Sequence, residues 1–224
     1  MEVNADFGQR ASVHAAGLPW VASPMAGVER RMLDRVGGEV ARATSIVRYA
    51  PGSAFSAHTH GGGEEFLVLE GVFQDERGDF PAGTYVRNPP TSRHTPGSAP
   101  GCVIFVKLWQ MAPEDRRTIR VDSGEMPPVS VPGRKGVDVV PLFSDAVETV
   151  RIERWAPGAV VEMAAPAGLE VLVLGGAFEE GGERFEGQSW LRLPPGAGLR
   201  AVAGSRGARV WMKLGHLATI RVPG

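Results

Sequence analysis

An internal repeat constrains the fold of this 224-residue chain more than any other feature of its sequence. When the chain is aligned with itself at an offset of about 105 residues, LVLEGVF at 67–73 matches LVLGGAF at 172–178. The block GCVIFVKL at 101–108 matches GARVWMKL at 207–214. Because the matching blocks recur in the same order, the sequence indicates two homologous units in tandem.

The repeat sets the expected domain boundaries. The first unit is expected to cover residues 1–121 and the second residues 137–224. The stretch DSGEMPPVSVPGRKG at 122–136 is rich in Pro and Gly, and this composition predicts a linker between the two units.

The repeated blocks have the character of β-strands. They are short, rich in β-branched and aromatic residues, and bounded by Gly and Pro at intervals of about ten residues. The chain has 30 Gly and 18 Pro and no long amphipathic pattern, which favours an all-β sandwich or barrel. Only ERRMLDRV at 29–36 has a pattern that favours a helix.

Metal-capable side chains are concentrated in the first unit. His58, His60 and Glu64 lie within seven residues, and His94 follows thirty residues after Glu64. Side chains two apart on a strand point to the same face, so His58 and His60 can bind one ion from one side. The glycines at 61–63 are expected to provide the sharp reversal that turns Glu64 toward the same ion.

This string resembles the first motif of the cupin family, G-x5-H-x-H-x3-E-x6-G, at every position from Gly52 to Gly71. Over roughly residues 20–110 the sequence is similar to the ChrR-like cupins, a group named for an anti-sigma factor that also contains small dioxygenases. The resemblance implies two tandem jelly-roll barrels, or double-stranded β-helices, in one chain. It also implies one divalent metal ion held by His58, His60, Glu64 and His94.

The second cupin motif, G-x5-P-x-G-x2-H-x3-N, is met only in part. Gly83, Pro89 and His94 are in place. Thr91 replaces the inner Gly, and Ser98 replaces the final Asn. The turn before His94 is therefore the part of the site that the resemblance supports least.

The second unit lacks every one of these ligands. The repeat aligns His58 with Ala164 and His60 with Pro166. It also aligns Glu64 with Leu169 and His94 with Leu199. We therefore expect the second barrel to keep its strands without a metal site, and to serve packing, dimerisation or closure over a ligand.

The repeat also distinguishes between two adjacent glutamates that the motif spacing allows as ligands. Glu65 aligns with Glu170 of the unit without ligands, whereas Glu64 has no acidic counterpart there. Glu64 is therefore the preferred ligand. Glu65 is expected to have a structural role, paired with Lys107 or Arg48.

Three imidazoles and one carboxylate suit Fe(II), Mn(II), Ni(II), Co(II) or Zn(II), and affinity alone does not select among these ions. Four protein ligands leave two positions free on a six-coordinate ion, as a catalytic site needs. Such a site favours small oxygenated organic molecules as ligands or substrates. The sequence shows no separate general base.

The remaining candidates are expected to have ordinary roles. His14 and His216 are interpreted as surface or loop residues, and Cys102 as a buried, inert thiol in an apolar strand. Phe55, Phe66 and Tyr85 are possible pocket walls, although core positions suit them better.

Charge and composition exclude several classes of protein. The net charge of −1 gives no basis for nucleic-acid binding, and one cysteine fits a reducing compartment. The amino terminus lacks the features of a signal peptide, and no run of eighteen apolar residues occurs. We expect a soluble, cytoplasmic monomer or homodimer.

Two functions follow from the resemblance. The favoured one is an enzyme, a metal-dependent dioxygenase that acts on diketone-like or hydroxyketone-like substrates; a cupin isomerase is less favoured. The alternative is a metal-bound sensory or regulatory cupin related to the ChrR anti-sigma factor, with a sigma factor as partner. The chain cannot supply the H-x3-C-x2-C zinc domain of that group, because it has one cysteine.

Overall fold

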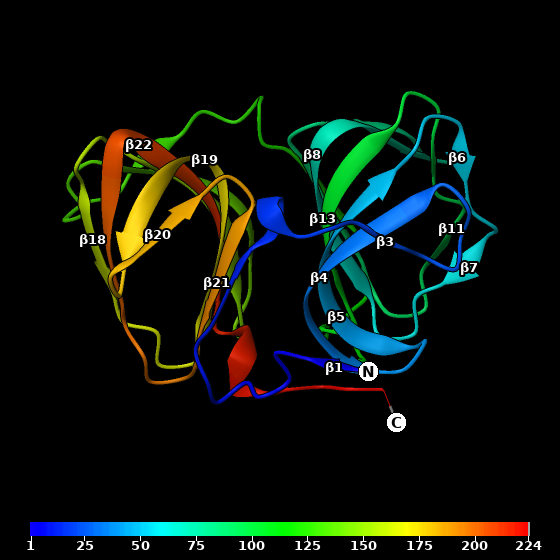
Figure 1. Cartoon of the computed structure of the whole chain (residues 1–224), viewed down its shortest axis with the longest axis horizontal. Helices are drawn as coiled ribbons and strands as arrows, with labels where there is room; N and C mark the ends of the chain where they lie inside the picture. Colours follow the sequence, from blue (N-terminus) through cyan, green and yellow to red (C-terminus); the bar gives the residue numbers. More distant parts are fainter. Residues whose placement is uncertain (224) are drawn as a thin grey trace. The chain divides into compact units, whose positions relative to one another are not determined.

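The fold is all-β, as predicted, and consists of two compact units (Figure 1). A computed structural model describes residues 1–223. Within that range the helical residues are confined to two short 3-10 turns, η1 (Ala15–Gly17) and η2 (His216–Ala218). No helix in the described range is long and apolar enough to cross a membrane.

The first unit comprises residues 1–5 and 18–124, together with residues 221–223. Its main antiparallel sheet has the order β1-β4-β5-β13-β8-β10-β14, and a second, two-stranded sheet pairs β11 with β7. Short strands join the main sheet at its sides, where β3 pairs with β4, β9 with β8, and β12 with both β6 and β8. The strands are β1 (Glu2–Val3), β3 (Val21–Ala22), β4 (Val28–Gly37), β5 (Ala41–Tyr49), β6 (Ser53–Ala54), β7 (His58–Thr59), β8 (Glu64–Asp75), β9 (Gly78–Pro81), β10 (Thr84–Asn88), β11 (Arg93–His94), β12 (Gly97–Ser98), β13 (Cys102–Leu108) and β14 (Ile119–Asp122).

The second unit comprises residues 6–17 and 125–220. Its antiparallel sheet has the order β15-β16-β17-β22-β19-β21-β2, with β18 paired to β22 and β20 to β19. This order repeats that of the first unit, as the sequence repeat requires. The strands are β2 (Ala11–His14), β15 (Val129–Ser130), β16 (Val137–Ser144), β17 (Thr149–Trp155), β18 (Val160–Met163), β19 (Leu169–Glu180), β20 (Glu183–Glu186), β21 (Ser189–Leu193) and β22 (Leu199–Leu214).

The amino-terminal segment departs from the expected boundary at residues 1–121. Residues 6–17 belong to the second unit, because β2 pairs with the edge strand β21. Arg10 reinforces this attachment through an ion pair with Glu180 at 2.8 Å. The expected linker at 122–136 also differs, since it contains β15, which pairs with β16.

The helix expected at 29–36 is wrong, because this segment lies within β4. The strand pairs with β5 along its length, with an irregularity between Met32 and Asp34. Glu, Arg, Met and Leu are good helix formers, but the ladder with β5 overrides this weak local preference. The bulge shifts the alternation of side chains, and this shift makes the segment resemble a helix in sequence.

Each unit has its own apolar core. In the first, aromatic residues of β8 and β9, including Phe66, Phe73 and Phe80, pack with Val28 and Tyr49. In the second, the corresponding core contains Trp155, Phe178 and Phe185, with Phe178 and Phe185 stacked at 4.8 Å between ring centroids. The expected buried position of Cys102 is confirmed, and burial raises the pKa of its thiol to about 11.

Candidate metal centre

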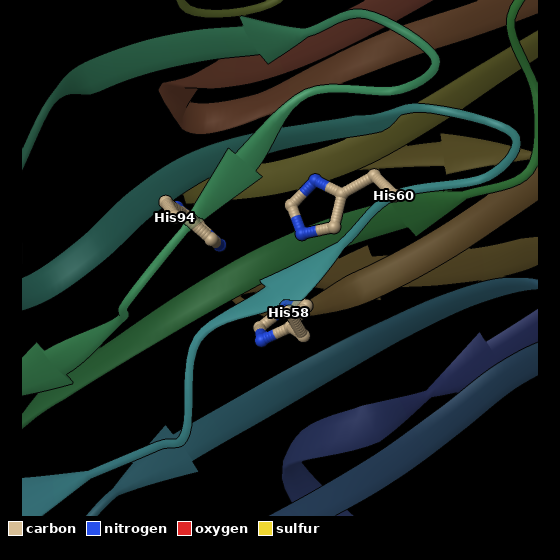
Figure 2. A group of neighbouring side chains, drawn as sticks. All are labelled: His58, His60 and His94. Atoms are coloured by element: carbon tan, nitrogen blue, oxygen red, sulfur yellow. The ribbon is translucent and has the colours of Figure 1, made fainter.

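Three histidines of the first unit converge on one point (Figure 2). The pairing of β7 with β11 places His58 directly opposite His94, and His60 follows at the end of β7. One ligand nitrogen from each ring lies within 4.8 Å of those of the other two. Figure 2 shows the rings directed toward one another, so these three side chains can bind one metal ion.

The polar atoms of these rings fit a metal ion. Within the described residues, both ring nitrogens of His60 and Nε2 of His94 are buried without a hydrogen-bond partner. His58 binds the carbonyl of Ser56 through Nδ1 at 3.2 Å, which leaves its Nε2 available. A buried nitrogen without a partner costs free energy, and a bound ion would remove that cost.

The protonation states also suit metal binding. Burial, followed by the charges of His58 and Arg77, lowers the pKa of His60 to about 4. Burial also lowers the pKa of His94, against the opposing effect of Glu64. Both rings are therefore neutral at pH 7, and the neutral imidazole is the form that binds metals.

Glu64, the first residue of β8, lies beside this cluster. Its Oε2 is 3.6 Å from Nδ1 of His60 and 3.6 Å from Nε2 of His94. Asn88, directly opposite on β10, donates a hydrogen bond to the same oxygen at 3.0 Å. The carboxylate is thus held beside the three histidines, with Asn88 fixing its orientation.

Glu65 points to the opposite face of the sheet. It accepts a hydrogen bond from the Tyr85 hydroxyl at 2.6 Å, and it lies across the β8–β13 pairing from Lys107. Arg48, the other partner considered for Glu65, forms an ion pair with Glu29 instead. Tyr85 therefore does not line the face of the sheet that carries Glu64.

Comparison with known proteins agrees with this geometry. Residues 8–112 match the profile of the ChrR cupin-like domain family. This segment, just under half of the chain, is a ChrR cupin-like domain of the cupin superfamily. Among curated proteins, none matches the chain.

Solved bicupin structures resemble the chain over most of its length. A protein of Nostoc punctiforme, provisionally assigned as a dioxygenase, has a TM-score of 0.72 at 16% identity and covers 100% of this chain and 86% of its own. Protein YlbA from E. coli has a TM-score of 0.71 at 15% identity, with coverages of 94% and 93%. A variant of Bacillus subtilis oxalate decarboxylase has a TM-score of 0.64 at 10% identity, with coverages of 92% and 77%. At these identities the likeness establishes the fold, and the two tandem cupin barrels predicted from the repeat are confirmed.

Asp75, a residue that the sequence did not single out, orients the ring of His94. Oδ2 of Asp75, at the end of β8, lies 3.2 Å from Nδ1 of His94. A carboxylate at Nδ1 holds the proton on that nitrogen and leaves Nε2 as the metal ligand. Arg77 binds the same carboxylate at 3.0 Å and keeps it in place.

Two residues with left-handed backbone conformations hold the turn that carries the ligands. Thr91 has φ 72° and Trp109 has φ 61°, which is unusual for a β-branched and for a bulky residue. The Thr91 amide donates to the His60 carbonyl at 2.8 Å, and the Trp109 amide donates to the Gly63 carbonyl at 3.1 Å. Thr91 thus forms the turn for which the cupin motif uses glycine. Strain of this kind is typical of functional sites.

Trp109 also explains two of the three glycines in this turn. Gly63 has φ 78° and provides the reversal, whereas Gly61 and Gly62 do not have positive φ. A Cβ at Gly62 would lie 2.3 Å from the Trp109 indole, and one at Gly61 would lie 2.8 Å from it. The expectation that all three glycines form the reversal is therefore corrected, because two of them make room for the indole.

Replacing Trp109 by Gly is expected to weaken metal binding by roughly tenfold, because the turn between His60 and Glu64 loses its support. The second unit already has glycine at this position, because the residue equivalent to Trp109 is Gly215, with φ 91°. Glycine adopts the left-handed conformation without strain, so this conformation should stabilise the folded variant by about 1–2 kcal/mol. This gain offsets part of the packing free energy that is lost with the indole. Calorimetric titration with zinc and denaturant unfolding of the metal-free protein measure the two effects.

Trp109→Phe is the matched control, because it keeps an aromatic ring over Gly61 and Gly62 and should retain most of the affinity. An unchanged zinc affinity in Trp109→Gly would show that the indole does not support the site.

The second barrel has a different interior at the equivalent positions. Leu169 and Leu199, which replace Glu64 and His94, pack into its apolar core. On the same core-lining side, Glu153 is fully buried and accepts hydrogen bonds from Trp155, Arg134 and Arg151. The donor nitrogens lie at 2.6 Å for Trp155, at 2.6 and 2.8 Å for Arg134, and at 2.7 Å for Arg151 from the carboxylate oxygens.

The two other histidines, His14 and His216, lie in different environments. His14 lies on β2 with half of its side chain exposed and pairs with Glu183 at 2.7 Å, as a surface residue does. The expectation for His216 is wrong, because its ring is buried and Nε2 lies 2.8 Å from Glu170. His216 begins η2, and this turn directs the ring toward the glutamate.

Proposed function

We propose that the protein is a metal-dependent cupin oxygenase that acts on small oxygenated organic molecules of the β-diketone or hydroxyketone type. The observation that supports this most is the group of three convergent histidines, with buried, unpartnered nitrogens and Glu64 beside them. His58 is exposed, so solvent reaches this site. A metal site with solvent access can admit a substrate, whereas a structural zinc site is closed by four protein ligands.

In this proposal the chain's residues prepare the site before substrate arrives. His58, His60 and His94 would provide three imidazole ligands, and Glu64 would provide a carboxylate oxygen as the fourth. Asn88 orients that carboxylate through its hydrogen bond. A bound divalent ion supplies Lewis acidity toward an enolate and, if it is iron, the capacity to react with O2.

The test is metal analysis of protein purified without added metal, followed by O2 uptake with β-diketones and hydroxyacetophenones. Iron with substrate-dependent O2 uptake is the expected result. His94→Ala should lose both metal and uptake, whereas His14→Ala, in the second unit, should lose neither. Zinc without turnover would overturn the proposal and favour a sensory role, the alternative that the ChrR-like domain supports.

A further inference from the structure

Two arginines lie on the face of the sheet that lines the metal-holding barrel. On β4, Arg30 is paired with Val47 of β5, and this face also carries the core residues Val28 and Tyr49. Beyond the bulge, Arg35 is paired with Ala43 on the same side. Both guanidinium groups therefore project from the core-lining face of β4.

The strand register connects this wall with Glu64. Ala43 is paired with Leu108 of β13, and Leu108 is paired with Glu64 of β8. Arg35 and Glu64 thus lie in one cross-strand row, three strand spacings apart. At about 4.8 Å per spacing their backbones are at most about 14 Å apart, a span that two side chains and a molecule of a few carbon atoms can fill.

Neither arginine is neutralised by a carboxylate in the part of the chain that the structure describes. Arg35 donates to the backbone carbonyls of Gly38 and Glu39, the latter at 3.2 Å. Arg30 has a buried Nε without a hydrogen-bond partner. Burial, followed by the charge of Arg30, lowers the pKa of Arg35, so the two cations are close enough to repel each other. An anion between them would offset this repulsion.

Solvent reaches part of the wall around these arginines, although Arg35 itself is buried, with 6% of its surface exposed. Arg30, Met32, Val47 and Leu108 are all half-buried, whereas Phe66, on the same face of β8, is closed off. Solvent therefore reaches this face at Arg30, beside the buried Arg35.

The second barrel provides an internal comparison. Val137 and Trp155 are paired there as Val28 and Tyr49 are in the first barrel, so the counterpart of Arg30 is Val139. By the same pairing, the counterpart of Arg35 is Ser144. Both arginines are thus missing from the barrel that lacks the candidate metal ligands.

We propose that Arg30 and Arg35 bind a carboxylate of the substrate while its carbonyl oxygens face the ion at the three histidines. This inference rests on the proposed function and narrows it to β-dicarbonyl compounds that carry an acid group. Arginine suits this role because its planar donors match a carboxylate.

The test compares two probes that differ in that group. Acetylacetone is a neutral β-diketone, and acetylpyruvate has a carboxylate in place of one methyl group. With iron-loaded protein, O2 uptake should show a kcat/KM for acetylpyruvate roughly 10–100-fold higher. Calorimetry with zinc-loaded protein, which does not consume O2, should show the same preference in binding.

Arg30→Met and Arg35→Met should each weaken acetylpyruvate binding and leave acetylacetone unchanged, and Arg30→Lys should recover part of the loss. Arg31→Met is the matched control. Arg31 is the next residue of β4, on the other face, with its guanidinium 4.1 Å from the Trp20 ring centroid. Circular dichroism checks that each variant folds.

The outcomes separate this inference from the function. Equal use of both probes, or a preference that survives both arginine variants, would overturn the inference and leave the oxygenase intact. Arginine-dependent binding of acetylpyruvate without O2 uptake would overturn the oxygenase and support the anion site. Binding of neither probe would contradict the anion site, and absence of O2 uptake with both would contradict the oxygenase for this substrate class.

Discussion

Replacing His60 by Ala is expected to lower the metal affinity of the first barrel by more than roughly 100-fold, beyond the loss typical of residues that only support a ligand. The three rings form a nearly equilateral triangle, with centroids 4.8 Å apart for His58 and His60, 4.7 Å for His60 and His94, and 5.1 Å for His58 and His94. Both nitrogens of His60 are buried without a partner among the described residues, so a bound ion is the natural acceptor for one of them. Removing this ring leaves two histidines that no longer surround a common point.

Two measurements check this expectation. Calorimetry gives the zinc affinity directly, and the rise in Tm on adding zinc gives it independently, because an ion that binds only the folded state stabilises that state. His14→Ala is the control, since His14 pairs with Glu183 in the second unit. Retention of one ion at wild-type affinity in His60→Ala would show that these histidines are not the metal site.

The convergence of His58 and His60 was predictable because the two residues lie within one short stretch of chain, and the family motif added His94. Strand periodicity brings His58 and His60 to one ion, and the repeat separates Glu64 from Glu65 by showing which one is retained without a metal site. Short-range geometry of this kind is set by the backbone alone.

The supporting residues were not predictable, because they come from distant parts of the chain. Trp109 contacts Gly61 and Gly62 across almost fifty residues, and a left-handed tryptophan has no signature in sequence. Asp75 reaches His94 only because β8 is long enough to bring its end beside β11.

The same limit applies to the fold. The repeat predicted two homologous units, but it could not show that residues 6–17 complete the second sheet. This contact spans about 175 residues, and in the first unit the equivalent strand is β14, which follows its sheet in sequence. The helix expected at 29–36 failed for a related reason, since local propensity is weaker than pairing with β5.

Glu153→Ala is expected to destabilise the second unit by about 3–5 kcal/mol, because it leaves two guanidinium groups without their shared partner. Arg134 donates to both carboxylate oxygens at 2.6 and 2.8 Å, and Arg151 donates at 2.7 Å. The carboxylate itself has no exposed surface. Denaturant unfolding followed by tryptophan fluorescence measures this loss, because three of the five tryptophans, Trp155, Trp190 and Trp211, lie in the second unit. Glu162→Ala removes a surface ion pair with Arg200 and should cost less than about 1 kcal/mol.

The destabilisation should also depend on pH. Burial acts to raise the pKa of Glu153, but the hydrogen bond from Arg134 and the charge of Arg151 outweigh it, so the pKa lies below its ordinary value of 4.5. The unfolded chain therefore takes up the proton first as the pH falls. The stability that Glu153 contributes is complete above about pH 4.5 and is lost as the pH falls through the lower pKa of the folded state. A difference between wild type and Glu153→Ala that stays constant on acidification would show that Glu153 has the same pKa in the folded and unfolded chain, and would contradict stabilisation of its charged form by Arg134 and Arg151.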